Sequence, residues 1–126
     1  MTIEQEVFDG LNAHTGLEEL VGDRIYEIQF PEGTAFPCVT YQQISGPREQ
    51  VVTGKVVGLS PRYQITAWSD DRVEADKVGD QIELAAVSLI GRDSFKDVTI
   101  AGSRHKPDTD AKLFGKDIDA ILLVAV

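Results

Sequence analysis

Cysteine and histidine are both scarce in this sequence of 126 residues, which contains one cysteine and two histidines. A single cysteine, Cys38, cannot form an intrachain disulfide, so a disulfide-stabilised extracellular scaffold is excluded and a reducing compartment is expected. We expect Cys38 to be a small buried apolar residue, since a nucleophilic thiol needs a neighbouring base and an electropositive setting. His14 and His105 are too few to form a site of histidine and cysteine ligands at set spacing, so no metal is expected.

Long apolar segments and excess positive charge are also missing. The longest apolar run, residues 120–126, is far shorter than the roughly 20 residues that cross a membrane. The acidic N-terminus lacks the basic start and apolar stretch of a secretion signal. Lysine and arginine number 12 against 21 aspartate and glutamate, a net charge of -9, which argues against broad binding to the DNA backbone. We therefore expect no membrane insertion and no specific binding of DNA.

Motifs of catalytic sites are absent as well. The sequence contains neither a phosphate-binding glycine loop between a strand and a helix nor a Gly-x-Ser-x-Gly elbow. The spacing Asp108-x-Asp110 is that of the first ligands of a calcium loop, but the later glycine and glutamate are missing, so solvated carboxylates are favoured. Residues 103–107, around His105, could form a small anion-binding loop, although a solvated loop is the better interpretation. We expect no catalytic residue and no cofactor.

Apolar residues at helical spacing predict two principal helices. The first covers residues 2–14, where Thr2 and Gln5 have the spacing of a capping box, and Gly16 is expected to close it. A short further turn over residues 17–21 should end at Gly22. The second helix is about 18 residues long and begins at Asp71, with Gly91 as its expected stop. Its expected buried stripe consists of Val73, Val78, Ile82, Ala85, Ala86 and Leu89.

The remaining segments predict strands and loops. Strands are expected over residues 25–29, 38–44, 62–69, 97–100 and 117–126, and residues 49–57 should form a hairpin arm or a mobile loop. Proline and glycine predict loops over residues 30–37 and 101–116. The strands cluster in the middle and at the end, which excludes the alternating order of a parallel α/β fold. We predict one α+β domain over residues 1–126: a mainly antiparallel sheet with two principal helices packed on one face.

The last predicted strand is apolar on both faces beyond Asp119, although a sheet covered by helices on one side should be polar on the other. Ile121 and Leu123 lie on the face opposite the helices, and Trp68 shares it. Such a face needs a cover, either another subunit or a loop over residues 103–116, and we favour the subunit. The expected interface residues, taken from face parity, are Trp68, Ile121 and Leu123, with Val51 and Val52 of the hairpin arm.

Four segments, in this order, resemble a known family. They are residues 20–26 (LVGDRIY), residues 37–46 (PCVTYQQISG), residues 62–70 (RYQITAWSD) running into the long helix with residues 75–78 (ADKV), and the terminal strand. Together they resemble the tail-completion or tail-terminator (tail-to-head joining) proteins of long-tailed phages, prophages and gene-transfer agents. The resemblance covers nearly the whole chain.

The resemblance implies a structural protein without enzymatic activity, part of the virion tail or neck and assembled in the bacterial host cytoplasm. Such proteins form a homo-oligomer, typically a hexameric ring, that caps the tail tube and joins it to the head connector. The implied partners are the tail tube protein and the head connector protein, and DNA passes through the lumen without specific binding. The alternatives are another neck ring, such as a head-side connector or stopper, and a small α+β ligand-binding protein or enzyme with a pocket between the second helix and the sheet.

Acidic charge is distributed unevenly along the chain. Residues 1–60 contain 9 acidic and 3 basic side chains, whereas residues 61–126 contain 12 and 9. In a ring through which DNA passes, an acidic lumen would repel phosphate and prevent sticking. We therefore expect the acidic half of the chain to face the lumen.

Overall fold

Helices and strands occur in separate runs along the chain, the order expected for an α+β domain. The structure, a computed structural model, describes residues 3–45, 49–52, 55–91, 95–108 and 112–125. Its elements are α1 (Ile3–Ala13), α2 (Thr15–Val21), β1 (Ile25–Glu27), β2 (Cys38–Ser45), β3 (Glu49–Val52), β4 (Lys55–Leu59), β5 (Arg62–Ser69), α3 (Arg72–Ser88), the 3-10 turn η1 (Leu89–Gly91), β6 (Phe95–Asp108) and β7 (Leu113–Ala125). Thr2 and Asp110, both singled out in the sequence, lie outside the described residues.

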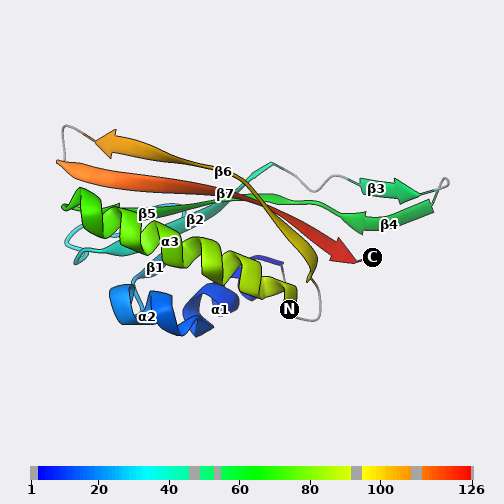
Figure 1. Cartoon of the computed structure of the whole chain (residues 1–126), viewed down its shortest axis with the longest axis horizontal. Helices are drawn as coiled ribbons and strands as arrows, with labels where there is room; N and C mark the ends of the chain where they lie inside the picture. The colour runs from blue at the N-terminus through cyan, green and yellow to red at the C-terminus, as the bar shows by residue number, and fades with distance from the viewer. Residues whose placement is uncertain (1–2, 46–48, 53–54, 92–94, 109–111, 126) are drawn as a thin grey trace.

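The strands form one mostly antiparallel sheet. Its body has the order β1-β2-β5-β7, β6 pairs with the other edge of β7, and β4 and β3 continue from the end of β7. β1 and β2 are parallel, and the other described pairs are antiparallel. Figure 1 shows α1, α2 and α3 on the same side of this sheet. The predicted α+β class is confirmed, with α2 as a third helix in the layer.

The core lies between the helix layer and the facing side of the sheet. In strands β2, β5 and β7 every second side chain points to this side, and each of these residues is at most 6% exposed: Val39, Tyr41, Tyr63, Ile65, Ile118, Ala120 and Leu122. They meet the buried stripe of α3, formed by Val78, Ile82, Ala85 and Ala86. Burial of a large apolar side chain contributes about 1.5–3 kcal/mol, so this layer supplies much of the stability of the domain.

The start of α3 matches the sequence prediction in its cap but not in its first apolar residue. The Asp71 carboxylate accepts a hydrogen bond from the backbone N–H of Val73 at 3.3 Å, as an N-cap residue does. Val73 was predicted to be buried, but it is 61% exposed. It lies five positions before Val78, about 140° away around the helix, so the buried stripe begins at Ala75 instead.

Residues 101–116 were predicted to form a loop, which is wrong for those that the structure describes. Residues 101–108 continue β6, and residues 113–116 begin β7, with paired residues from Phe95↔Val124 to Asp108↔Leu113. Gly102 and Pro107 led to the prediction. Gly102 lies at an irregularity of the ladder after Ile100, and Pro107 lies in a strand at the sheet edge, where a missing N–H is tolerated.

The loop between α1 and α2 also differs from the prediction. Gly16 does not close the first helix but lies inside α2, where an added Cβ would meet the Gln81 side chain of α3. Gly22 ends α2 with a φ of 61°, as predicted. The ring of His14 lies 3.1 Å from Gln81 Oε1, which ties this loop to α3.

The predicted hairpin arm is confirmed. β3 and β4 pair with each other, and β4 reaches the rest of the sheet through Gly58↔Ala125 and Leu59↔Val124. In Figure 1 the β3–β4 hairpin, called the arm below, projects along the long axis beyond the sheet and helices.

Candidate interaction surface

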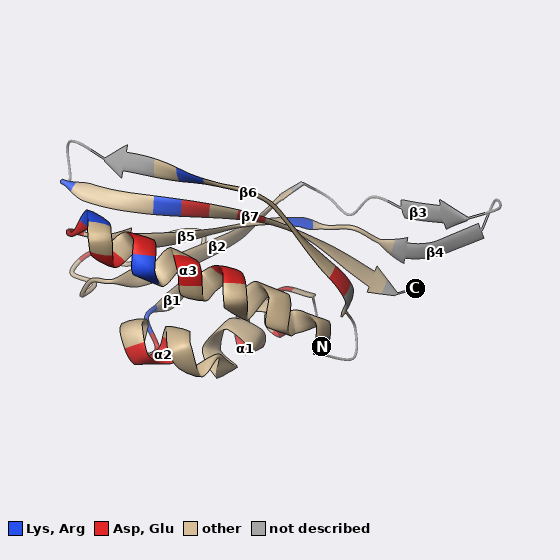
Figure 2. Ribbon diagram, viewed as in Figure 1, with Lys and Arg blue, Asp and Glu red and all other residues tan. Residues whose placement is uncertain are grey.

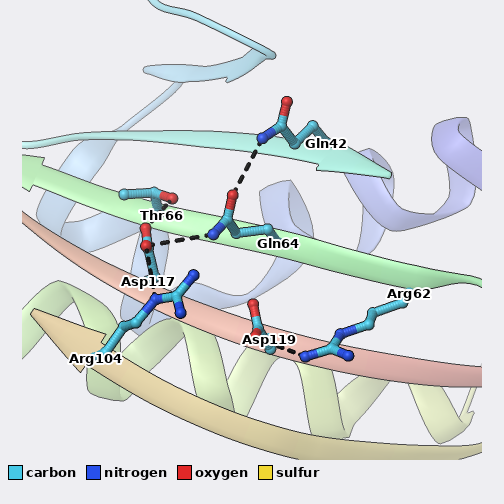
Figure 3. Close-up of polar contacts among 7 residues, drawn as sticks. All are labelled: Gln42, Arg62, Gln64, Thr66, Arg104, Asp117 and Asp119. Carbon is cyan, nitrogen blue, oxygen red and sulfur yellow. Dashed lines mark hydrogen bonds and ion pairs between the residues drawn. The ribbon is translucent and has the colours of Figure 1, made fainter. Parts of the chain in front are cut away.

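The face of the sheet opposite the helices is a candidate interaction surface, called the open face below. In Figure 1 no described helix lies on this side. Side-chain alternation in β2, β5 and β7, together with Arg104 of β6, brings a set of polar residues to it: Gln42, Arg62, Gln64, Thr66, Arg104, Asp117 and Asp119. Figure 3 shows these seven residues arranged across four neighbouring strands.

Asp117 is the centre of a hydrogen-bond network on the open face. Its Oδ1 accepts a hydrogen bond from the Thr66 hydroxyl at 2.7 Å, and its Oδ2 accepts one from the Gln64 amide at 3.3 Å. Gln42 Nε2 extends the row by donating to Gln64 Oε1 at 3.1 Å. Arg104 Nε lies 3.5 Å from Asp117 Oδ2 (Figure 3). Asp117 is only 2% exposed, and a charge buried so deeply is costly unless it has partners. These hydrogen bonds and the ion pair with Arg104 supply them.

A second ion pair lies one row further along the open face. Arg62 Nη2 donates to Asp119 Oδ2 at 2.9 Å, and the two side chains are 41% and 16% exposed. The two pairs place opposite charges side by side on neighbouring strands, so the middle of the open face is polar and locally neutral.

The apolar part of the open face is smaller than the sequence predicts. Ile121 and Leu123 do lie on this face, and both are half-buried. Ile121 is flanked by Arg62 on β5 and by Thr99 on β6, so polar neighbours surround it. The alternative cover, a loop over residues 103–116, is wrong for the described residues, because they are strands of the same sheet.

Trp68 has contacts within its own chain that the sequence did not reveal. Its indole N–H donates to the Thr40 hydroxyl at 3.0 Å, and its ring meets the edge of Phe30 with centroids 5.9 Å apart. Phe30 in turn meets Phe36 at 5.5 Å. The segment between β1 and β2 thus folds towards Trp68 and leaves it half-buried.

The five predicted interface residues do not form one patch. Trp68 is paired with Gly115 near the start of β7, whereas Leu123 lies eight residues further along, about 27 Å away in an extended strand. Val51 and Val52 belong to β3 of the arm, and their side chains lie outside what the structure describes. Ile121 and Leu123 therefore lie towards the end of the sheet from which the arm projects.

An apolar ridge on the helix layer was missed in the sequence. Leu84, Val87 and Ile90 are 56%, 46% and 43% exposed. They follow one another at intervals of three, on the outer side of α3 and its 3-10 extension, whereas the prediction considered only the buried stripe. The sequence therefore did contain the signal for this ridge, as a second row of apolar residues at helical spacing.

The candidate reactive side chains are held in structural roles. Cys38 is fully buried, and burial raises the pKa of its thiol to about 12, although the nearby positive charge of Arg24 acts in the opposite direction. His105 belongs to β6 rather than to a loop, and its Nδ1 lies 3.5 Å from Asp76 Oδ1. Within the described residues, no group of three or more His, Cys, Asp or Glu side chains could hold a metal ion.

The space between α3 and the sheet, expected to hold a pocket in the ligand-binding alternative, is packed. Val78, Ile82, Tyr63 and Ile65 are at most 1% exposed. A cavity of about 330 Å³ lies instead at the edge of the helix layer, lined by Gly10, Ala13, His14, Thr15, Gly16 and Ser88. None of the described helices has the length and apolar character needed to span a membrane.

Comparison with known proteins gives one family and a shared fold. The sequence matches the family described as "Tail completion protein gp17" over residues 5–124. A solved chain from "Virion of native gene transfer agent (GTA) particle" superposes with a TM-score of 0.76 at 17% sequence identity, over 98% of this chain and 95% of that chain. A second solved chain superposes with a TM-score of 0.56 at 10% identity, over 99% and 98%. No curated protein matches the sequence.

Proposed function

Because the chain belongs to the gp17 family of tail completion proteins, it is a structural component of a virion tail, and we propose that it completes the tail as a closed ring. The ring, composed of six copies, caps the head-proximal end of the tail tube and stops its growth. Its two faces bind the tail tube protein and the head connector protein. The protein acts through binding surfaces alone, without catalysis or a cofactor.

The observation that carries this proposal is the family match over residues 5–124, and the shape of the chain supports it. The helix layer lies on one side of the sheet and the open face on the other, while the arm projects from one end (Figure 1). Two different surfaces on one chain favour a head-to-tail contact, and such contacts form a ring when the rotation between copies closes.

We place Ile121 and Leu123 at the contact between neighbouring copies. Both are half-buried on the open face, where a neighbour would remove their remaining apolar surface from water. We assign Val51 and Val52 of the arm, and Trp68 at the other end of the open face, to separate parts of the contact between copies.

Replacement of Leu123 by Asp tests this placement. A carboxylate at a covered apolar site has no partner, so the Leu123→Asp chain should remain folded but sediment as a monomer under conditions in which the unmodified chain forms its oligomer. Val73→Asp is the matched control, since Val73 is 61% exposed on the helix layer and the change is chemically the same. If Leu123→Asp retains the native oligomer, the contact lies elsewhere.

A further inference from the structure

The arm is an insertion between two strands that are already neighbours. Ser45 at the end of β2 and Arg62 at the start of β5 are Cα partners in the antiparallel ladder. The chain therefore leaves the sheet at Ser45, forms β3 and β4, and returns to a point beside its departure. A two-residue turn could join β2 directly to β5, so the body of the sheet does not need the arm to connect its strands.

The arm also has few contacts with its own chain. Two pairs of residues at the base of β4 link it to β7, and the rest of the described arm pairs only with itself. A two-stranded hairpin is marginally stable on its own in water. The described backbone of β3 forms a free outer edge, because β4 occupies its other side. The arm therefore presents an unpaired strand away from the body of the domain.

A second free edge runs along β6. This strand spans Phe95–Asp108 and pairs with β7, and no other described strand pairs with it. Such an edge presents a row of unpaired N–H and C=O groups to any strand that can reach it.

The direction of these groups follows from one hydrogen bond. The backbone N–H of Leu122 donates to the carbonyl oxygen of Pro61 at 3.0 Å, so it points towards β5 and away from β6. Its Cα partner Val98 must then point its own N–H outward. That N–H donates to Oδ1 of the Asp97 carboxylate at 2.9 Å. The same alternation, carried past the irregularity at residues 100–102, directs the N–H of Ile100 and Ser103 outward.

Charged residues flank an uncharged stretch of β6. Asp97 occupies the outward N–H of Val98, and Arg104 begins the charged part that follows, with its side chain paired to Asp117 of β7. Between them lie Thr-Ile-Ala-Gly-Ser, residues 99–103, which carry no charge and are exposed except for the half-buried Ile100. This stretch of five residues is long enough to pair with the four residues of β3, Glu49–Val52.

We propose that β3 of one copy pairs with the outer edge of β6 of the next copy, over residues 99–103. The contact rests on the ring proposed above and explains how that ring closes. Each copy gives an arm on one side and receives one on the other, so the free edges of β3 and β6 are both paired once the ring is complete. Main-chain hydrogen bonds supply the affinity, as in other cases of strand addition.

Two variants test the two sides of the contact, the arm and the β6 edge, independently. In the arm-deleted chain, residues 46–61 are replaced by Asn-Gly, which suits a two-residue hairpin turn between Ser45 and Arg62. In the edge variant, Ser103→Pro removes an outward N–H at an exposed position and leaves the ladder to β7 in place. Ser103→Ala retains the N–H and is the matched control. Thr99→Lys, which places a charge on the open stretch, is a second edge variant should proline disturb the fold.

Each variant alone should weaken self-association at least tenfold in analytical ultracentrifugation, whereas Ser103→Ala should assemble like the unmodified chain. A mixture of the arm-deleted chain and Ser103→Pro should form one-to-one dimers and nothing larger. In such a dimer the arm of Ser103→Pro pairs with the intact β6 edge of the arm-deleted chain. No third copy can add, because the arm-deleted chain has no arm and the β6 edge of Ser103→Pro is blocked. Circular dichroism of each variant verifies that the domain remains folded.

Other binding partners of the arm predict different results in these experiments. An arm that binds the tail tube or the connector would let the arm-deleted chain oligomerise normally, which overturns the inference and leaves the proposed ring intact. An arm that pairs with another arm would leave Ser103→Pro and Thr99→Lys without effect and yield no mixed dimers, which also overturns it. If the unmodified chain forms no ring, the proposed function fails instead.

Discussion

At the scale of single residues, Asp117 is the most deeply buried of the described charged side chains, with 2% of its surface exposed. Thr66 and Gln64 both donate to its carboxylate. In Asp117→Asn the new NH2 group faces either the Gln64 amide, which donates, or the Thr66 hydroxyl, which must turn to accept it. In both orientations the negative charge that pairs with Arg104 is lost. The free energy of unfolding should therefore fall by about 1–3 kcal/mol, measured by urea denaturation.

Asp119→Asn is the comparison for that measurement. Asp119 pairs with Arg62, whose side chain is 41% exposed, and ion pairs open to solvent contribute about 0–1 kcal/mol. The loss of stability should therefore be smaller than for Asp117→Asn. Equal losses in the two variants would show that the network around Asp117 adds nothing beyond a surface ion pair.

Cys38 gives a second prediction at this scale. Burial raises the pKa of its thiol to about 12, so the thiolate that reacts with alkylating reagents is nearly absent at pH 8. Iodoacetamide at pH 8 should leave the folded chain unmodified and label it fully in denaturant, as measured by mass spectrometry. The stability that the protonated thiol contributes is present below pH 9 and is lost as the pH rises towards 12. Rapid labelling of the folded chain would contradict this burial.

At the scale of elements, the packing of α3 on β7 depends on Gly79. A Cβ at this buried position would lie 2.6 Å from Cγ of Lys116, close to the base of that side chain. Alanine favours a helix over glycine by about 1 kcal/mol, but overpacking costs about 1–3 kcal/mol. Gly79→Ala should therefore lower the free energy of unfolding by up to about 2 kcal/mol despite its better helix propensity.

Asp80→Ala is the control for the packing of α3, since Asp80 is exposed and only helix propensity changes. Its stability should stay equal or rise slightly. A stabilising effect of Gly79→Ala would mean that α3 lies further from β7 than the structure indicates.

Elements were predictable from the sequence where local signals agree with tertiary packing. The Asp71 cap, the alternation in β5 and the glycine after α2 each specify a local conformation, and all three are confirmed. The second half of β6 was not predictable, because Gly102 and its neighbours have little strand propensity of their own and are held by the ladder to β7.

The open face shows the same division between local pattern and tertiary contact. The alternation of side chains along β7 correctly predicted that Ile121 and Leu123 lie on the open face, since this alternation is a local property of a strand. The contact of Phe30 with Trp68 joins residues 38 positions apart and leaves no periodic trace in the sequence. The polar network likewise depends on register, because Thr66 meets Asp117 only when β5 and β7 are aligned as they are.

At the scale of the whole molecule, acidic charge gathers in the helix layer. α1 and α2 contain five carboxylates and no lysine or arginine, whereas β6 and β7 contain both signs (Figure 2). If the acidic half lines the lumen of the ring, as we propose, α1 and α2 face passing DNA and repel its phosphates.

Charge reversal tests this orientation. Glu19→Lys on α2 should increase retention of double-stranded DNA by the assembled ring at low salt, and the effect should vanish as ionic strength rises. Asp70→Lys is a matched control of equal charge change at an exposed turn outside the helix layer. Equal retention by the two variants, or a ring with a basic lumen, would contradict the orientation.

The central claim is that this tail completion protein works as a closed ring, and the most direct test is native mass spectrometry of the purified chain combined with negative-stain electron microscopy. We predict one species with a central opening, composed of six 13.8 kDa copies, about 83 kDa. A compact monomer at every concentration, or open filaments of undefined length, would contradict the claim.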